Sequence, residues 1–311
     1  MSKYAINEEF LQQIEALQVI LKNNLAGLFG GNHKSRTYGS SCEFADYRDY
    51  IPGDDITKID WNAYARFDKL YLKLYLDERQ VHTRIYIDAS RSMDYGNSKK
   101  AWMALQLAAA LAYISICEMD KVSIYYIKNN KVHEVINGIV GRESFYNQIN
   151  KLNDIEFSDD CFISEGILPT KVGYGDGMSI IISDFLTSNN YESAIDYLVD
   201  KKRDLYCFQV LSKEETKPNI RGKVHFYDSE DQNNQYRKNI NKDIAKAYNM
   251  ALEYTVDRIR NYCNSRNAGY LFVRSDKSVS EILLKTLPEM GVLKWFLSIL
   301  WGWLVLLGFQ F

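Results

Sequence analysis

The sequence lacks the motifs that mark the commonest classes of enzyme. It contains no G-x-x-x-x-G-K-[ST] loop for nucleotide phosphates and no G-x-S-x-G turn of the hydrolase type. Its four histidines are scattered, and "HEVIN" at 133–137 has no second histidine to complete a zinc protease helix. The chain is therefore not itself a P-loop ATPase, a serine hydrolase or a zinc protease of these kinds.

Cysteine and net charge are also low. The five cysteines are far apart and none forms a C-x-x-C pair, which excludes a zinc knuckle or dithiol motif and indicates reduced thiols in a cytosolic protein. The 38 basic and 40 acidic residues leave a net charge of −2, so there is no bulk electrostatic reason to bind nucleic acid. The polar, amphipathic start "MSKYAINEEFLQQIEALQ" does not resemble a signal peptide.

What the chain does have, from residue 83 to 290, is an alternation of strand and helix patterns. "MSIIIS" at 178–183 is a continuous apolar run of the kind found in central parallel strands. "KVSIYYI" and "KVHEVI", joined by "KNNK", predict a hairpin. The alternation predicts a doubly wound, mostly parallel α/β sheet of Rossmann-like architecture.

The rest of the chain adds three shorter segments to this sheet. Apolar residues at helical spacing predict an N-terminal amphipathic helix, and "LYLKLYL" at 70–76 alternates as a half-buried edge strand does. We therefore expect four parts, which are a helix (1–27), a small β-containing segment (28–80), the α/β domain (81–290) and an apolar tail (291–311).

Two aspartates stand at predicted strand ends. Asp88 ends the strand "TRIYID", with Ser90 and Ser92 at alternate positions after it, and Asp184 follows "MSIIIS". In a doubly wound sheet, ligands bind where parallel strands end at their carboxyl side. Carboxylate and hydroxyl oxygens are hard donors that suit Mg²⁺, Mn²⁺ or Ca²⁺. These four residues therefore predict a divalent cation site, unless Asp88 merely caps the next helix or closes an Asx-turn.

The pattern D-x-S-x-S with a later strand-end aspartate resembles the metal-ion-dependent adhesion site (MIDAS) of von Willebrand factor A domains. The resemblance implies a von Willebrand A-like fold in which Asp88, Ser90 and Ser92 hold Mg²⁺ or Mn²⁺ and Asp184 acts through water. The family's loop threonine has no clear counterpart here, and Ser144 is a weak substitute for it. The implied activity is binding of an acidic side chain on a partner protein.

A second signature occupies "YRDYIPGDDITKIDWNAYARFDKLYLK" at 47–73. Pro52 and Gly53 predict a turn, and the aspartates after it suit a helix start. Arg48 and Arg66 lie among several acidic residues, which indicates a salt-bridged structural clamp with Trp61 as its anchor.

This segment resembles a bacterial family known as domain of unknown function 58, and the resemblance covers about residues 28–290. It implies an adaptor that works with a MoxR-type AAA+ ATPase and membrane-bound von Willebrand A proteins in assembly or maturation. The matching signature residues include Arg48, Gly53, Asp54, Asp55, Asp60, Trp61 and Arg66.

The apolar stretch at 295–311 is near the lower limit of a membrane span, and its tryptophans are typical of an interfacial anchor. A tail anchor would hold a cytoplasmic domain at the inner face of the cell membrane. The alternatives are a helix that folds onto the domain and an atypical extension.

Three functions remain open. The first is a non-enzymatic, metal-dependent binding module. The second is a metal-assisted phosphoester hydrolase, although Ser90 stands where such an enzyme usually has a second acid. The third is a scaffold whose metal site is degenerate, since the loop threonine is missing.

Overall fold

A computed structural model describes residues 5–28, 44–75, 81–96, 99–158, 161–175, 177–186, 191–218, 222–227 and 235–289. These residues form two compact units. One comprises 5–28 with 81–289, and the other comprises 44–75. The apolar tail expected at 291–311 lies outside the described residues, so its role as an anchor stays a prediction.

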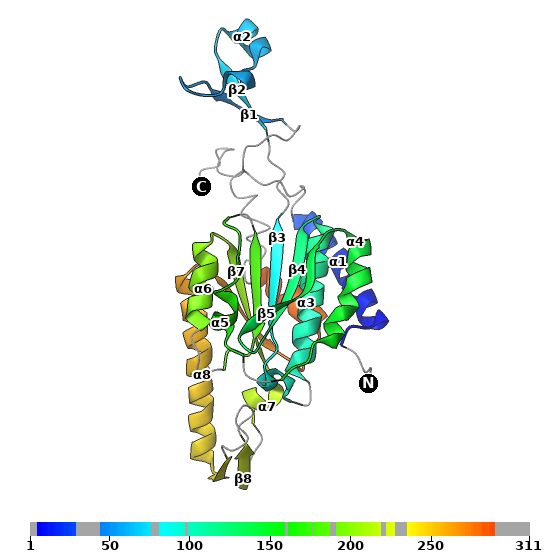
Figure 1. Cartoon of the computed structure of the whole chain (residues 1–311), viewed down its shortest axis with the longest axis vertical. Helices are drawn as coiled ribbons and strands as arrows, with labels where there is room; N and C mark the ends of the chain where they lie inside the picture. Colours follow the sequence, from blue (N-terminus) through cyan, green and yellow to red (C-terminus); the bar gives the residue numbers. More distant parts are fainter. Residues whose placement is uncertain are drawn as a thin grey trace. The chain divides into compact units, whose positions relative to one another are not determined.

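A six-stranded sheet forms the centre of the larger unit (Figure 1). Its order is β10-β7-β6-β3-β4-β5, and every neighbouring pair is parallel except β4 with β5. The strands of this sheet are β3 (His82–Asp88), β4 (Lys121–Lys128), β5 (Lys131–Ile139), β6 (Met178–Ser183), β7 (Asp204–Leu211) and β10 (Gly269–Arg274). The expected doubly wound, mostly parallel α/β sheet is thus confirmed.

The strands form where the apolar patterns predict them. Every residue of β6 is buried, as expected for a strand covered on both faces. Asn129 and Asn130 join β4 to β5 with φ angles of 50° and 59°. Asparagine tolerates positive φ better than most residues, and two such residues in succession are typical of a tight hairpin. The predicted hairpin is therefore present, and it supplies the antiparallel edge of the sheet.

Helices cover both faces of the sheet. On one face, α5 (Ile163–Ile167), α6 (Tyr191–Asp200) and the C-terminal part of α8 (Lys242–Ser265) bury side chains against alternate strand residues. On the other face, α3 (Lys100–Cys117) contacts four of the strands. Beside α3 lie α1 (Glu8–Leu28), α4 (Arg142–Gln148) with η3 (Ile149–Asp154), and α9 (Val279–Glu289).

Helix α3 is apolar around most of its circumference because it lies inside the protein. It is long and apolar enough to span a membrane, but 78% of its residues are buried within the protein. Core helices of globular domains share this composition. Its small residues, such as Ala104, Ala108 and Ala112, are fully buried, so the helix lies close to the sheet.

The alternation from residue 83 to 290 also predicts a strand at 223–228, and its expected place in the main sheet needs correction. The segment "KVHFYD" does form a strand, β8 (Gly222–Tyr227), but it pairs with β9 (Gln235–Ile240) in a separate antiparallel hairpin and not with the main sheet. Strand β9 was not expected, because its last residues, 238–240, fall where the sequence predicts the start of a long helix at about 238–264. The long helix therefore begins at Lys242, with Asn241 as its N-cap.

The smaller unit is a hairpin with a short helix. Strand β1 (Phe44–Asp49) pairs antiparallel with β2 (Tyr71–Tyr75), and between them lie η1 (Ile56–Lys58) and α2 (Trp61–Phe67). The strand expected at 70–76 is thus correct in position, but it pairs with β1 and not with the edge of the main sheet.

The signature residues of this unit form turns and caps. Gly53 has φ of 109° in the turn from Ile51 to Asp54, a conformation that glycine adopts readily. The Asp54 carboxylate accepts hydrogen bonds from Arg48 and from the backbone N–H of Ile51. Asp55 caps η1, and Asp60 caps α2 through the backbone N–H groups of residues 62 and 63.

Two members of the expected clamp behave differently from the prediction. Trp61 is 61% exposed and contacts Tyr64 edge to face, so it is not a buried anchor. Arg66 lies in the last turn of α2 and forms no ion pair with any residue that the structure describes. The ion pair of Arg48 with Asp54 is present at 2.8 Å. The clamp is therefore made by Asp54, Asp55 and Asp60 and not by the tryptophan.

Candidate functional site

The two strand-end aspartates lie on neighbouring strands at one edge of the sheet. Strands β3 and β6 are parallel neighbours, with Ile87 opposite Ile182. In chain order the six strands follow the 3-2-1-4-5-6 arrangement, and its switch point falls between these two strands. Asp88 and Asp184 therefore stand at the crevice where this type of sheet binds ligands.

The first motif folds back onto Asp88. The carboxylate Oδ1 accepts a hydrogen bond of 2.9 Å from the backbone N–H of Ser90, which is an Asx-turn, and η2 (Arg91–Asp94) follows at once. The Asp88 Oδ2 accepts a hydrogen bond of 2.5 Å from the Ser183 hydroxyl at the end of β6. The simpler interpretation of Asp88 as an Asx-turn residue is thus realised, but the same carboxylate also joins the two strands.

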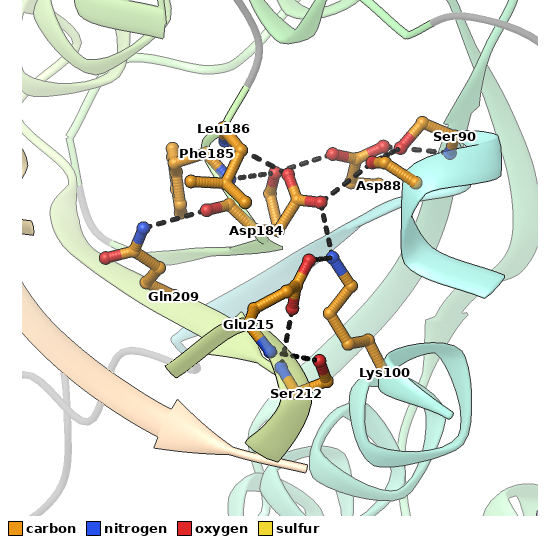
Figure 2. A network of polar contacts seen from close by, with 11 residues as sticks. Asp88, Ser90, Lys100, Asp184, Phe185, Leu186, Gln209, Ser212 and Glu215 are labelled. Carbon is orange, nitrogen blue, oxygen red and sulfur yellow. Dashed lines mark hydrogen bonds and ion pairs between the residues drawn. The ribbon is translucent and has the colours of Figure 1, made fainter. Parts of the chain in front are cut away.

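Ser92 closes a set of four residues, of which Asp88, Ser90 and Asp184 are labelled in Figure 2. Its hydroxyl donates a 2.8 Å hydrogen bond to Asp184 Oδ2, and it lies 3.0 Å from the Ser90 hydroxyl. Asp88, Ser90 and Asp184 are buried, whereas Ser92 is half-buried. The structure thus brings together the four residues that the sequence analysis named as a candidate metal site.

A constrained turn orients Asp184. Phe185 has φ of 52°, an unfavourable conformation for a bulky residue, and its ring is buried against Tyr191. This turn brings the backbone N–H of Leu186 within 3.1 Å of Asp184 Oδ1, while the Gln209 side chain donates to the Asp184 carbonyl oxygen. Backbone strain of this kind is concentrated at functional sites.

Two charged residues that the sequence analysis did not assign complete the network in Figure 2. Lys100 is fully buried, and its Nζ lies 2.8 Å from Asp184 Oδ2 and 2.7 Å from Glu215 Oε1. Glu215 is held in turn by a capping box with Ser212 at the start of α7 (Lys213–Thr216). The sequence does contain this capping box, S-x-x-E after a strand, so a signal for Glu215 was present.

Burial and the neighbouring charged groups both act on the pKa values of Asp88 and Lys100. Burial, together with the nearby Asp184 carboxylate, raises the pKa of Asp88, although hydrogen bonds from Ser183 and Ser90 partly counteract this rise. Burial lowers the pKa of Lys100, but Asp184 and Glu215 outweigh this effect and the pKa is raised overall. Lys100 is therefore an ammonium at neutral pH, and it neutralises Asp184 and not Asp88.

The loop after the first motif packs tightly against the end of β7. Gly96 has φ of 91°, and a Cβ atom placed there would lie 2.8 Å from the Cβ of Ser212. Only glycine fits this contact without displacing backbone. The loop that follows the two serines is thus in direct contact with Ser212, the N-cap of the helix that carries Glu215.

Ser144 lies away from the site. It is on α4, which follows β5, and β5 runs antiparallel to β4 so that Ile139 pairs with Val122 near the start of β4. The end of β5 therefore lies at the opposite edge of the sheet from Asp88. The structure instead places Ser158 nearby, because its backbone N–H donates to the carbonyl of Ala89. The sequence analysis missed Ser158, which belongs to no regular element and has no motif around it.

The donor set suits a hard divalent cation. Among the described residues no group of three or more His, Cys, Asp or Glu side chains is arranged to hold a metal ion. The oxygen donors at this site are the carboxylates of Asp88 and Asp184 and the hydroxyls of Ser90 and Ser92. No lysine or arginine within the described ranges pairs with Asp88, although it is buried. A buried carboxylate with no cation is costly, and Mg²⁺ or Mn²⁺ held by Asp88, Ser90 and Ser92 would neutralise it.

Comparisons with known proteins place the chain among bacterial relatives. The model of the family "Protein of unknown function DUF58" matches residues 46–255. Uncharacterized proteins of Mycobacterium bovis and Mycobacterium tuberculosis are 23% identical over 224 residues, which is 70% of this chain and 70% of each relative.

Solved structures show a more distant likeness. The VWA domain of SpRpn10 has a TM-score of 0.38 and 10% identity, covering 66% of this chain and 94% of that domain. The pilus adhesin SpaC of Lactobacillus rhamnosus GG has a TM-score of 0.33 and 11% identity, covering 60% of this chain and 31% of the adhesin.

Proposed function

Because the chain belongs to the family of proteins of unknown function DUF58, we propose its role from the site: it is a non-enzymatic adaptor that binds a partner protein through a divalent cation. The observation that carries this proposal is the union of Asp88, Ser90, Ser92 and Asp184 at the switch point of the sheet. Asp88, Ser90 and Ser92 would hold Mg²⁺ or Mn²⁺, and the cation would supply positive charge for an acidic side chain of the partner.

The surroundings of the site support a role in binding. Beside η2 lies a cavity of about 220 Å³ whose lining includes Asp94, Lys99 and Trp102. Aromatic side chains in such hollows are common anchors for partner residues. Asp94 lies two residues after Ser92, so one short segment contributes to both the cation site and the cavity.

The hydrolase alternative has less support. A phosphoester hydrolase needs a nucleophile or base next to the metal, or a lysine free to hold phosphate. The lysine near the site, Lys100, is fully buried and paired with two carboxylates, while Lys99 is paired with Asp94. The position of a second acid is occupied by Ser90. These features favour binding over catalysis.

The partner that we propose is a MoxR-type AAA+ ATPase, with membrane-bound von Willebrand A proteins as further members of the assembly. This part of the proposal rests on the family resemblance of the two signatures and on the lack of a P-loop in the chain itself.

Cation dependence can be tested by thermal unfolding. Mg²⁺ or Mn²⁺ should raise the melting temperature of the wild-type chain, because a ligand of the native state stabilises it by about 2.7 kcal/mol at a hundred times its Kd. Asp88→Ala should lose this response, and Ser90→Ala with Ser92→Ala should weaken it. Equal shifts in wild type and Asp88→Ala would exclude a cation at Asp88.

Partner binding needs a separate measurement. Purified MoxR-type ATPase should bind the wild-type chain in Mg²⁺ and lose affinity for the Ser90→Ala, Ser92→Ala double variant. Lys202→Gln, an exposed residue just before the start of β7, is the surface control. Unchanged affinity would show that the partner uses another surface. Phosphatase turnover that disappeared in Asp88→Ala would overturn the assignment as a non-enzyme.

A further inference from the structure

Lys100 lies where it can act on the cation site from within the protein. It is the first residue of α3, it is fully buried, and its ammonium contacts Asp184 and Glu215. Its neighbour Lys99 is instead 49% exposed and pairs with Asp94 at the surface. A buried lysine between two carboxylates is rare and costly to desolvate, so its position calls for an explanation.

We propose that Lys100 is a built-in competitor of the divalent cation, and that Glu215 sets the strength of this competition. In the cation-free protein Lys100 neutralises Asp184. When the site is loaded, Glu215 keeps the ammonium paired while Asp184 turns its charge toward the cation. The inference rests on the proposed function and names how the same site is regulated.

The first support is that Lys100 and Ser92 converge on one oxygen. Asp184 Oδ2 accepts hydrogen bonds from the Lys100 ammonium and from the Ser92 hydroxyl, both at 2.8 Å. While the Ser92 hydroxyl donates to Asp184, its oxygen lone pairs can still bind a metal ion. A metal ion at Ser92 would, however, also lie near the Lys100 ammonium. Like charges repel strongly in a buried site, so Lys100 lowers the affinity for any second cation.

The second support is the way Glu215 is held. Its Oε2 accepts a 2.7 Å hydrogen bond from the backbone N–H of Ser212, and its Oε1 accepts a hydrogen bond from the Lys100 ammonium. The Ser212 hydroxyl in turn accepts from the Glu215 backbone N–H. The capping box thus fixes Glu215 independently of Asp184, so that the lysine keeps one partner if Asp184 engages a cation.

The third support is the charge of the network. Asp88, Asp184 and Glu215 are three carboxylates with one ammonium, Lys100, which gives a formal charge of −2 when all are ionised. A divalent cation brings this sum to zero. Removal of Lys100 makes the sum −3, and neutralisation of Glu215 makes it −1. The two changes should therefore move the cation affinity in opposite directions.

The test is calorimetric titration of the full chain with Mn²⁺ alone at fixed pH. Lys100→Met should bind Mn²⁺ about tenfold more tightly than wild type, which is the scale of outer contacts on metal sites. Glu215→Gln should bind it more weakly, because Lys100 then pairs with Asp184 alone. Lys99→Met, which removes an exposed lysine one position earlier, should match wild type.

Opposite shifts are the signature of competition, since a purely structural loss would weaken both variants. If Lys100→Met does not fold, Glu215→Gln decides the matter: equal or tighter binding of Mn²⁺ overturns the competition. If wild type binds Mn²⁺ and neither variant changes the affinity, only the competition fails. If neither the wild type nor any variant binds Mn²⁺, the proposed cation-dependent function is wrong, and the competition is wrong with it.

Discussion

Two aspartates, one in each unit of the chain, begin or end a structural element and yet differ in charge behaviour. Asp60 caps α2, accepts a hydrogen bond from the Tyr47 hydroxyl and pairs with Lys73 at 3.2 Å. Hydrogen bonding from Tyr47 lowers its pKa to about 2, against a smaller effect of burial. Asp88 ends β3, and burial together with Asp184 raises its pKa instead.

The two aspartates differ in whether a lysine side chain pairs with them. Lys73 is a third exposed and serves Asp60 directly. In the larger unit the buried lysine pairs with Asp184 and Glu215, and no lysine or arginine among the described residues pairs with Asp88, which accepts hydrogen bonds from the Ser183 hydroxyl and the Ser90 backbone N–H. Asp60, which pairs with a lysine, stays charged as part of a structural clamp. Asp88 has no such lysine among the described residues, and its carboxylate is therefore suited to bind a metal ion.

Among the substitutions that test this comparison, Lys100→Met should have the largest effect on stability. Removing the ammonium leaves Asp184 and Glu215 facing each other in the interior without a counter-charge. Breaking a buried ion pair from one side costs about 3–5 kcal/mol. Urea unfolding in chelator should show a free energy of unfolding lower by this amount, and Lys99→Met should change that free energy by less than about 0.5 kcal/mol. Similar free energies of unfolding for both variants would contradict the assignment of the buried charge.

Asp120 sharpens the comparison, because it is buried and burial raises its pKa from 3.8 to about 7. The folded state then holds the proton more tightly than the unfolded state, so stability is full below pH 4 and falls as the pH rises toward 7. We expect a loss of about 2 kcal/mol between pH 5 and pH 7. Asp120→Asn should remove most of this slope in denaturant titrations, and an unchanged slope would assign it to another group.

Asp60 should show the opposite sign. Its folded pKa of about 2 lies below the ordinary 3.8, so its contribution is full above pH 4 and is lost as the pH falls toward 2. Resistance of residues 44–75 to pepsin should therefore drop between pH 4 and pH 2. Asp60→Asn should lower the resistance at pH 4 and flatten the pH dependence. The lowered pKa values of Asp54 and Asp55 leave a residual slope in the variant.

Trp61→Ala should have the smallest effect on stability. The side chain is 61% exposed, and surface substitutions usually change stability by about 0.5 kcal/mol or less. A large loss in thermal unfolding would restore the anchor role that the sequence analysis gave to this residue. A neutral result, in contrast to Asp60→Asn, would locate the clamp in the aspartates.

Much of the site was accessible from the sequence because it depends on local order. Asp88 and Asp184 each follow a run of buried strand residues, and parallel strands end at a common edge. Ser158 and Glu215 were not found, and Lys100 was not assigned to the site, because their proximity to the two aspartates depends on packing between segments far apart in the chain. Ser144 was placed wrongly for the same reason, since the antiparallel direction of β5 carries it to the other edge.

The sequence by itself determined the alternation of helices and strands, the hairpin at Asn129 and Asn130, and the turns and caps of the signature, because each follows from the preferences of adjacent residues. The tertiary structure alone decided the pairing partners of β2 and β8, which depend on competition among strands of similar composition. It alone also decided that a buried lysine neutralises Asp184 and not Asp88, because a charge in the interior takes the partner that packing brings within reach.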